Sequence, residues 1–222
     1  GQTYTPYELY REAAKDAAFY RKGGGGVTLS GGEALVQWEA AAETLRLCRS
    51  NYINTCLETS AYAPWEHLWA AAQFCNTVFV DLKHMDSRRH EEGTGVPNEQ
   101  ILENIQQLCR ELPKRGGKVI LRLPLIPGYN DGEELTNTLR DLAELAPAVK
   151  SVAAVPVGLT KYREGLTPLR LFTPEESRDV IRRMEAMGHA DVNQVYNLND
   201  LVSADDVMFI ATGVTNGDVL SG

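Results

Sequence analysis

Apolar strand-like segments of this chain alternate with amphipathic helical segments, and this alternation constrains the fold more than any other feature of the sequence. The predicted strands are residues 27–29, 53–57, 77–82, 118–125 and 151–155, with a further strand candidate at residues 207–211. Strands that alternate with helices at this spacing are joined by right-handed crossovers and form a parallel sheet. The pattern therefore predicts an α/β fold, either an open doubly wound sheet or a complete or partial β/α barrel.

Capping signals support the predicted helices, which are residues 5–22, 34–49, 65–74, 98–112, 133–145 and a last one beginning at Thr173. Thr5-Pro6-Tyr7-Glu8 combines an N-cap threonine, a proline at the first helical position and a capping-box glutamate. After Gly188 the sequence becomes polar and turn-like. We therefore predict a β/α core over residues 1–188 and a short appendage over residues 189–222.

Charge and hydropathy narrow the classes of partner. The formal net charge of -8 disfavours binding to nucleic acid or to an anionic membrane surface, because both require a basic field. No apolar run approaches the length of a membrane span. A small ligand or another protein is the expected partner.

The spacing of the cysteines indicates their redox state and the cellular compartment. Cys48, Cys56, Cys75 and Cys109 are widely spaced, with no two close enough for one loop to wrap a metal ion. We expect reduced, mostly buried thiols and, since no secretory leader is visible, a cytoplasmic protein. The chain begins at Gly1 without a methionine, which is expected of a processed product or a fragment.

Polar residues follow the predicted strands at the end where parallel α/β folds bind ligands. These residues are Ser30, Gly31, Gly32 and Glu33 after the first strand, Glu58 and Thr59 at the second, Asp81 and Lys83 at the third, and Arg122 in the fourth. Paired glycines allow a ligand to approach the backbone closely. Carboxylates can accept from an ammonium group while Lys83 and Arg122 hold a carboxylate, so the set suits an amino-acid-like zwitterion.

Each of these features also has a purely structural interpretation. A Gly-Gly-Glu sequence after a strand is often only a tight turn, and Asp81 with Lys83 could form an ion pair at a barrel rim. The loop at residues 127–131 has strong turn chemistry and could either cover a site or only connect two elements. The shared location at successive strand ends favours function, because the structural interpretation does not require it.

Residues 24–145 resemble the activating enzymes of glycyl radical enzymes, which belong to the radical S-adenosylmethionine superfamily. The resemblance rests on residues 25–34 (Gly-Gly-Val-Thr-Leu-Ser-Gly-Gly-Glu-Ala), 55–59 (Thr-Cys-Leu-Glu-Thr), 81–83 (Asp-Leu-Lys) and 126–131 (Ile-Pro-Gly-Tyr-Asn-Asp). It implies a partial β/α barrel in which Ser30–Glu33 contact the amino group of S-adenosylmethionine. Glu58, Thr59, Asp81, Lys83 and Arg122 would line the same pocket. The implied partner is a glycyl radical enzyme, which loses a hydrogen atom from a backbone glycine.

The chain departs from that family in its cysteines. The family holds a four-iron four-sulfur cluster through Cys-x-x-x-Cys-x-x-Cys, normally upstream of the first predicted helix, and this chain contains no such triplet. Three thiolates must converge on one cluster, so the resemblance implies a barrel truncated before its cluster motif and inactive on its own.

The C-terminal segments carry two further resemblances. Residues 151–181 resemble a family of iron-sulfur oxidoreductases that also have a radical-type barrel. Residues 200–218 resemble a late segment of class II fructose-1,6-bisphosphatases. These resemblances leave open whether the chain is a mosaic or a fusion of segments from different families. Two alternative functions also remain: a metal-dependent sugar-phosphate phosphatase and a noncatalytic ligand-binding module.

Overall fold

The computed structural model describes residues 2–145, 148–159 and 164–188. These residues divide into two compact units. The first comprises residues up to Asp81 together with Pro97–Ile120, and the second comprises Leu82–Val96 and the described residues from Leu121 onward. The predicted boundary at residue 188 lies at the edge of the described residues, so the separate appendage remains a prediction.

The strands pair in chain order, β1-β2-β3-β4-β5. Their bounds are β1 Gly26–Leu29, β2 Asn54–Thr59, β3 Thr77–Asp81, β4 Lys118–Leu125 and β5 Val149–Pro156. β2 pairs in parallel with both β1 and β3, with Thr28 opposite Cys56 and Cys56 opposite Thr77. The predicted α/β fold with a parallel sheet is confirmed.

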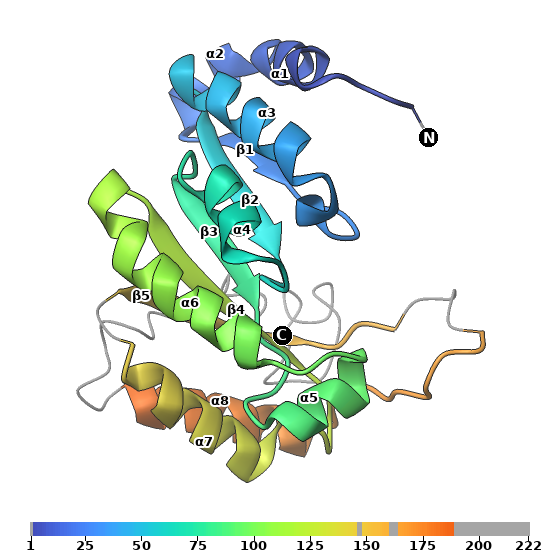
Figure 1. The fold of residues 1–222 in the computed structure, drawn as a ribbon. Coiled ribbons are helices and arrows are strands. Elements are labelled where there is room, and N and C mark those ends of the chain that lie inside the picture. The colour runs from blue at the N-terminus through green and yellow to red at the C-terminus, as the bar shows by residue number, and fades with distance from the viewer. Residues whose placement is uncertain (1, 146–147, 160–163, 189–222) are drawn as a thin grey trace, which may run out of the picture. The chain divides into compact units, whose positions relative to one another are not determined.

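The helices of the first unit are α1 Pro6–Ala14, α2 Ala17–Gly23, η1 Ala34–Gln37, α3 Trp38–Ser50, α4 Trp65–Ala72, α6 Glu99–Glu111 and η2 Pro113–Arg115. Of these, α3 and α4 lie beside the strands β1, β2 and β3 (Figure 1). α3 and α4 lie side by side, α3 contacts β2, and α1 packs on α3. Leu45, Leu57, Leu68, Val78 and Ile105 are fully buried and form much of the core of this unit, because apolar faces of helices and strands meet there.

The second unit contains α5 Ser87–Thr94, α7 Gly132–Ala143 and α8 Pro174–Gly188. α7 and α8 pack against each other, with Leu135, Leu139 and Val180 at most 1% exposed. The Arg183 guanidinium joins the two helices, since it donates to Thr136 Oγ1 at 2.7 Å and contacts Glu133 Oε1 at 3.1 Å.

Two predicted helical features differ from the structure. The single helix expected over residues 5–22 is divided at Lys15 and Asp16, whose amides donate to carbonyls three residues back and tighten the chain into a turn. Helix α5 was not predicted, because its sequence is highly charged and lacks an apolar period. Its N-cap is Asp86, whose carboxylate accepts from the Arg89 amide at 2.8 Å. By contrast, the predicted capping box of Thr5 and Glu8 is confirmed.

One glycine permits the close pairing of β1 with β2. A Cβ at Gly26 would overlap the carbonyl oxygen of Asn54 on the neighbouring strand, so a side chain at this position would force the two backbones apart. The strand that leads into Ser30 therefore depends on glycine at its first residue. Within the described ranges, no helix combines the length and apolarity that crossing a bilayer requires.

Candidate functional site

The loop after β1 presents bare backbone to open space. Gly31 has φ +116°, a conformation that side chains disfavour. A Cβ built on either Gly31 or Gly32 would meet nothing within 4 Å. Both residues are also exposed, so a ligand can approach their backbone.

Ser30 fixes the start of this loop to β2. Its hydroxyl donates to Glu58 Oε2 at 2.6 Å, across 28 residues of sequence. Glu58 is half-buried near the end of β2, one residue before Thr59. The contact places a carboxylate beside the exposed glycines.

Glu33 fixes the end of the same loop. Its Oε1 accepts from the Leu35 amide at 3.1 Å and from Thr59 Oγ1 at 2.8 Å. Its Oε2 accepts from the amide and the hydroxyl of Ser60 at 2.9 and 2.7 Å. Both oxygens therefore accept hydrogen bonds within the protein, and the Glu33 side chain joins the loop to the end of β2.

The two contacts hold the glycine backbone at both sides against the C-terminal end of one strand. Fixed carbonyls and a neighbouring carboxylate suit a ligand with an ammonium group, because their oxygens accept from it and charge-assisted hydrogen bonds are the stronger ones. The structure thus brings together six predicted residues of the first unit, which are Ser30, Gly31, Gly32, Glu33, Glu58 and Thr59.

The remaining predicted residues lie at the ends of β3 and in β4. Asp81 is the last residue of β3 in the first unit. Lys83 and Arg122 belong to the second unit, where both are half-buried. The backbone amide of Leu82 donates to the carbonyl of Arg122 at 2.9 Å. Their role in ligand binding stays a prediction.

Asn130, in the predicted turn at residues 127–131, supports the segment that carries Lys83. Its Nδ2 donates to the carbonyls of Lys83 and Pro124, both at 2.8 Å, and its Oδ1 accepts from the Ile126 amide at 2.8 Å. The turn is thereby attached to both segments by a side chain that is only 5% exposed. Sequence reasoning identified the turn chemistry of this loop but not its buried asparagine.

Tyr129 attaches the same turn to α5. Its hydroxyl donates to the Arg89 carbonyl at 2.6 Å, and its ring packs edge-on against His84 with 5.1 Å between ring centroids. Burial is the main cause of the raised pKa of the Tyr129 hydroxyl, so it stays protonated as a donor. A Cβ at Gly93 would overlap this hydroxyl.

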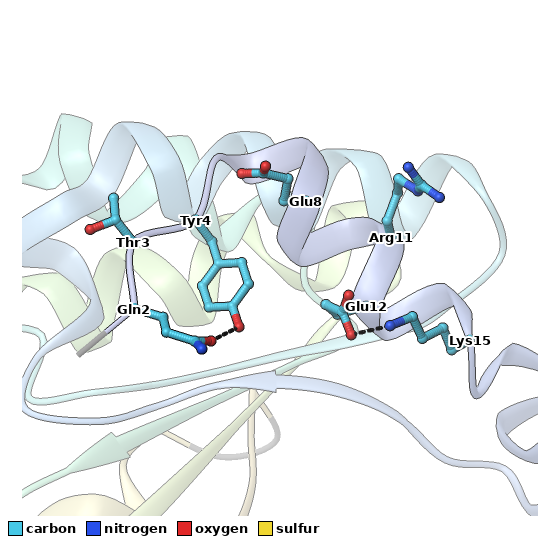
Figure 2. Close-up of a pocket in the computed structure, with 7 residues that line it drawn as sticks. All are labelled: Gln2, Thr3, Tyr4, Glu8, Arg11, Glu12 and Lys15. Atoms are coloured by element: carbon cyan, nitrogen blue, oxygen red, sulfur yellow. Dashed lines mark hydrogen bonds and ion pairs between the residues drawn. The ribbon is translucent and has the colours of Figure 1, made fainter.

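A hollow of about 530 Å³ lies along α1, and none of the predicted site residues lines it. Figure 2 shows that its walls come from the N-terminal segment and from α1 itself. Two pairs of its polar groups bond to each other: the Tyr4 hydroxyl donates to Gln2, and Lys15 contacts Glu12 at 2.5 Å. Both pairs are local, because each joins residues two or three positions apart in the sequence.

The cysteines do not fit the iron-sulfur cluster that the sequence resemblance implies. Cys48, Cys75 and Cys109 are buried and unbridged. Burial raises the pKa of all three thiols, that of Cys109 to about 11, whereas cluster ligands are thiolates. Among the described residues, which include every cysteine, no group of three His, Cys, Asp or Glu side chains could hold a metal ion.

We therefore expect this chain to retain no cluster after anaerobic incubation with ferrous iron and sulfide. The measurement is bound iron and sulfide after desalting, together with visible absorbance. A Cys56→Ser variant is the control, because Cys56 is the cysteine that is not fully buried. Stoichiometric iron that survives desalting and disappears in this variant would contradict the expectation.

Comparison with known proteins identifies two family models that match this chain. Residues 2–142 match the family model described as the radical SAM superfamily. Residues 160–222 match the model of the bacterial fructose-1,6-bisphosphatase that is glpX-encoded. This second match covers less than half of the chain and falls largely outside the described residues.

Individual relatives match over most of this chain. The isethionate sulfite-lyase activating enzyme of Nitratidesulfovibrio vulgaris is 34% identical over 84% of this chain and 61% of its own length. The choline trimethylamine-lyase activating enzyme of Oleidesulfovibrio alaskensis is 44% identical over 74% of this chain and 54% of its own length. The chain therefore spans less than two thirds of these curated relatives.

A solved structure supports the same fold. The crystal structure of a domain of the pyruvate-formate lyase-activating enzyme from Bacteroides vulgatus has a TM-score of 0.61 and 26% identity. The alignment covers 78% of this chain and 98% of that domain.

Proposed function

Because the chain belongs to the radical S-adenosylmethionine superfamily, we propose that it binds S-adenosylmethionine as the cofactor-binding part of an activating enzyme for a glycyl radical enzyme. The observation that carries the proposal is the open Gly31–Gly32 backbone held between Ser30 and Glu33 beside the Glu58 carboxylate. The named activating enzymes among the relatives support the choice of partner class. The phosphatase alternative is not favoured.

The residues of the first unit fit the methionine part of this cofactor. Backbone carbonyls at Gly31 and Gly32 and the Glu58 carboxylate would accept from its ammonium group, while Ser30 keeps that carboxylate in place. In this family, S-adenosylmethionine that is cleaved by one-electron reduction would supply the deoxyadenosyl radical that takes a hydrogen atom from a backbone glycine of the partner. The chain's own cysteines do not fit the iron-sulfur cluster, so the proposal for this chain is limited to binding of S-adenosylmethionine. The cytoplasmic location stays a prediction.

Calorimetric titration with S-adenosylmethionine tests the proposal. We expect saturable binding by the unaltered chain, and binding about tenfold weaker in a Glu58→Gln variant, because one charge-assisted hydrogen bond to the ammonium group becomes neutral. Glu66→Gln, an exposed change on α4, is the matched control and should leave the affinity unaltered. Lack of binding by the unaltered chain, or equal affinities in both variants, would refute the proposal.

A further inference from the structure

We infer that Asn104 on α6 is a positioning residue for the Gly31–Gly32 backbone, acting through the turn that follows β2 and through Glu33. The inference deepens the proposed function and rests on it for the identity of the ligand. The side-chain amide of Asn104 donates to the turn after β2 rather than to the glycine loop, so its influence must pass through a series of hydrogen bonds within the first unit.

Asn104 is a polar side chain in the apolar face of its helix. The neighbouring buried positions of α6 are Ile101, Ile105 and Leu108, and Asn104 itself is only 2% exposed. Burying an amide costs free energy unless it is hydrogen-bonded. Its Nδ2 donates to the carbonyls of Ala61 and Ala63, both at 2.8 Å, so both of its N–H groups are used on one turn.

That turn has an unfavourable backbone conformation. Ala61 has φ +57°, the left-handed region that costs a residue with a side chain roughly 1–2 kcal/mol. Its side chain is fully buried, and such a conformation persists only when its surroundings hold it. The two hydrogen bonds from Asn104, to the carbonyls of Ala61 itself and of Ala63, supply that restraint.

The same turn directs two hydroxyls at Glu33. The Ala61 amide donates to Thr59 Oγ1 at 2.9 Å, and the Tyr62 amide donates to Ser60 Oγ at 3.3 Å. Each hydroxyl has one hydrogen of its own. When its oxygen accepts from a backbone amide, the hydroxyl hydrogen points away from that amide and can donate to another group. Both hydroxyls donate to the Glu33 carboxylate, at 2.8 and 2.7 Å. The conformation that Asn104 maintains is thus the one that holds Glu33 and the end of the glycine loop.

The first test is amide hydrogen exchange in an Asn104→Ala variant. The amides of Leu35 and Ser60, which donate to Glu33, should exchange about tenfold faster, the factor that weakening one hydrogen bond to a charged group produces. Ile105→Val is the matched control, because it removes a buried methyl group from the next position of α6 and leaves the hydrogen bonds of Asn104 intact. Equal exchange at Leu35 and Ser60 in the two variants would overturn the inference.

The second test is calorimetric titration with S-adenosylmethionine. We expect affinity about tenfold weaker in Asn104→Ala than in Ile105→Val. When Asn104→Ala is combined with Glu33→Gln, the loss should be smaller than the sum of the two single losses, because both residues act through one set of hydrogen bonds. Unaltered affinity in Asn104→Ala, or strictly additive losses, would count against the inference.

The two tests separate the inference from the proposed function. If the unaltered chain does not bind S-adenosylmethionine but the exchange result is as expected, the proposed function is wrong and the action of Asn104 on the loop is supported. If Asn104→Ala does not fold, Thr59→Val interrupts the same series one step later with little change in volume. It should accelerate exchange at Leu35, and normal exchange there would overturn the inference.

Discussion

Replacement of Glu33 by alanine is expected to lower the free energy of unfolding by about 2–4 kcal/mol and to remove detectable binding of S-adenosylmethionine. The Glu33 carboxylate accepts from the Leu35 amide, from the Thr59 hydroxyl and from both polar groups of Ser60. Hydrogen bonds to charged groups contribute roughly 1.5–3 kcal/mol each to stability. At a half-buried site, water can hydrogen-bond to some of the groups that lose their partner, so the net loss is smaller than the sum. Chemical denaturation and calorimetry measure the two effects.

The chemistry of the carboxylate can be separated from its volume. Glu33→Gln keeps one acceptor oxygen but replaces the other with an NH₂ group. That group would face hydrogen-bond partners of Glu33 that are themselves donors. The variant should therefore lose about half of the stability that Glu33→Ala loses. Glu39→Ala, an exposed change in α3, is expected to lie within roughly 0.5 kcal/mol of the unaltered chain. If Glu33→Ala is as stable as Glu39→Ala, the structural role assigned to Glu33 is wrong.

Asn130→Asp is expected to destabilise the second unit by about 3 kcal/mol or more at neutral pH. The amide nitrogen of Asn130 donates to the carbonyls of Lys83 and Pro124, and an aspartate would put a charged oxygen against these two acceptors. The side chain is 5% exposed, so solvent relieves little of the repulsion. Thermal and denaturant unfolding measure the loss.

Asn137→Asp provides the matched control for this change. Asn137 is exposed on α7, and its Oδ1 accepts from Arg140 at 3.1 Å, a contact that an aspartate retains. This substitution should be close to neutral. Similar losses in the two variants would show that Asn130 has no special role in the turn.

The sequence allowed much of the fold to be predicted, because period and capping are local. The predicted limits of β4 agree with the structure, and the other strands predicted before residue 188 each overlap an observed one. The strand candidate at residues 207–211 lies outside the described residues. Helix α5 was missed because its charged sequence lacks an apolar period, so that its capping residues Asp86 and Gly95 were the available signals. The break at Lys15 depends on backbone geometry that composition does not reveal.

The candidate site was predictable in composition but not in the role of each residue. Grouping Ser30, Glu33, Glu58 and Thr59 followed from the rule that parallel strands end together. The sequence could not show that Glu33 would accept from Ser60, because such a contact depends on how a loop folds 27 residues away. Asn104 did leave a trace: a polar residue within the stripe of Ile101, Ile105 and Leu108 indicates a buried hydrogen-bonding task.

The contact between Tyr129 and α5 makes two distant positions interdependent. Any residue larger than glycine at position 93 would occupy the space of the tyrosine hydroxyl, and a smaller residue at position 129 would lose the hydroxyl that donates to the Arg89 carbonyl. Neither position can therefore vary alone without loss. A redesign of this chain has to treat Gly93 and Tyr129 as one choice, even though 36 positions of sequence separate them.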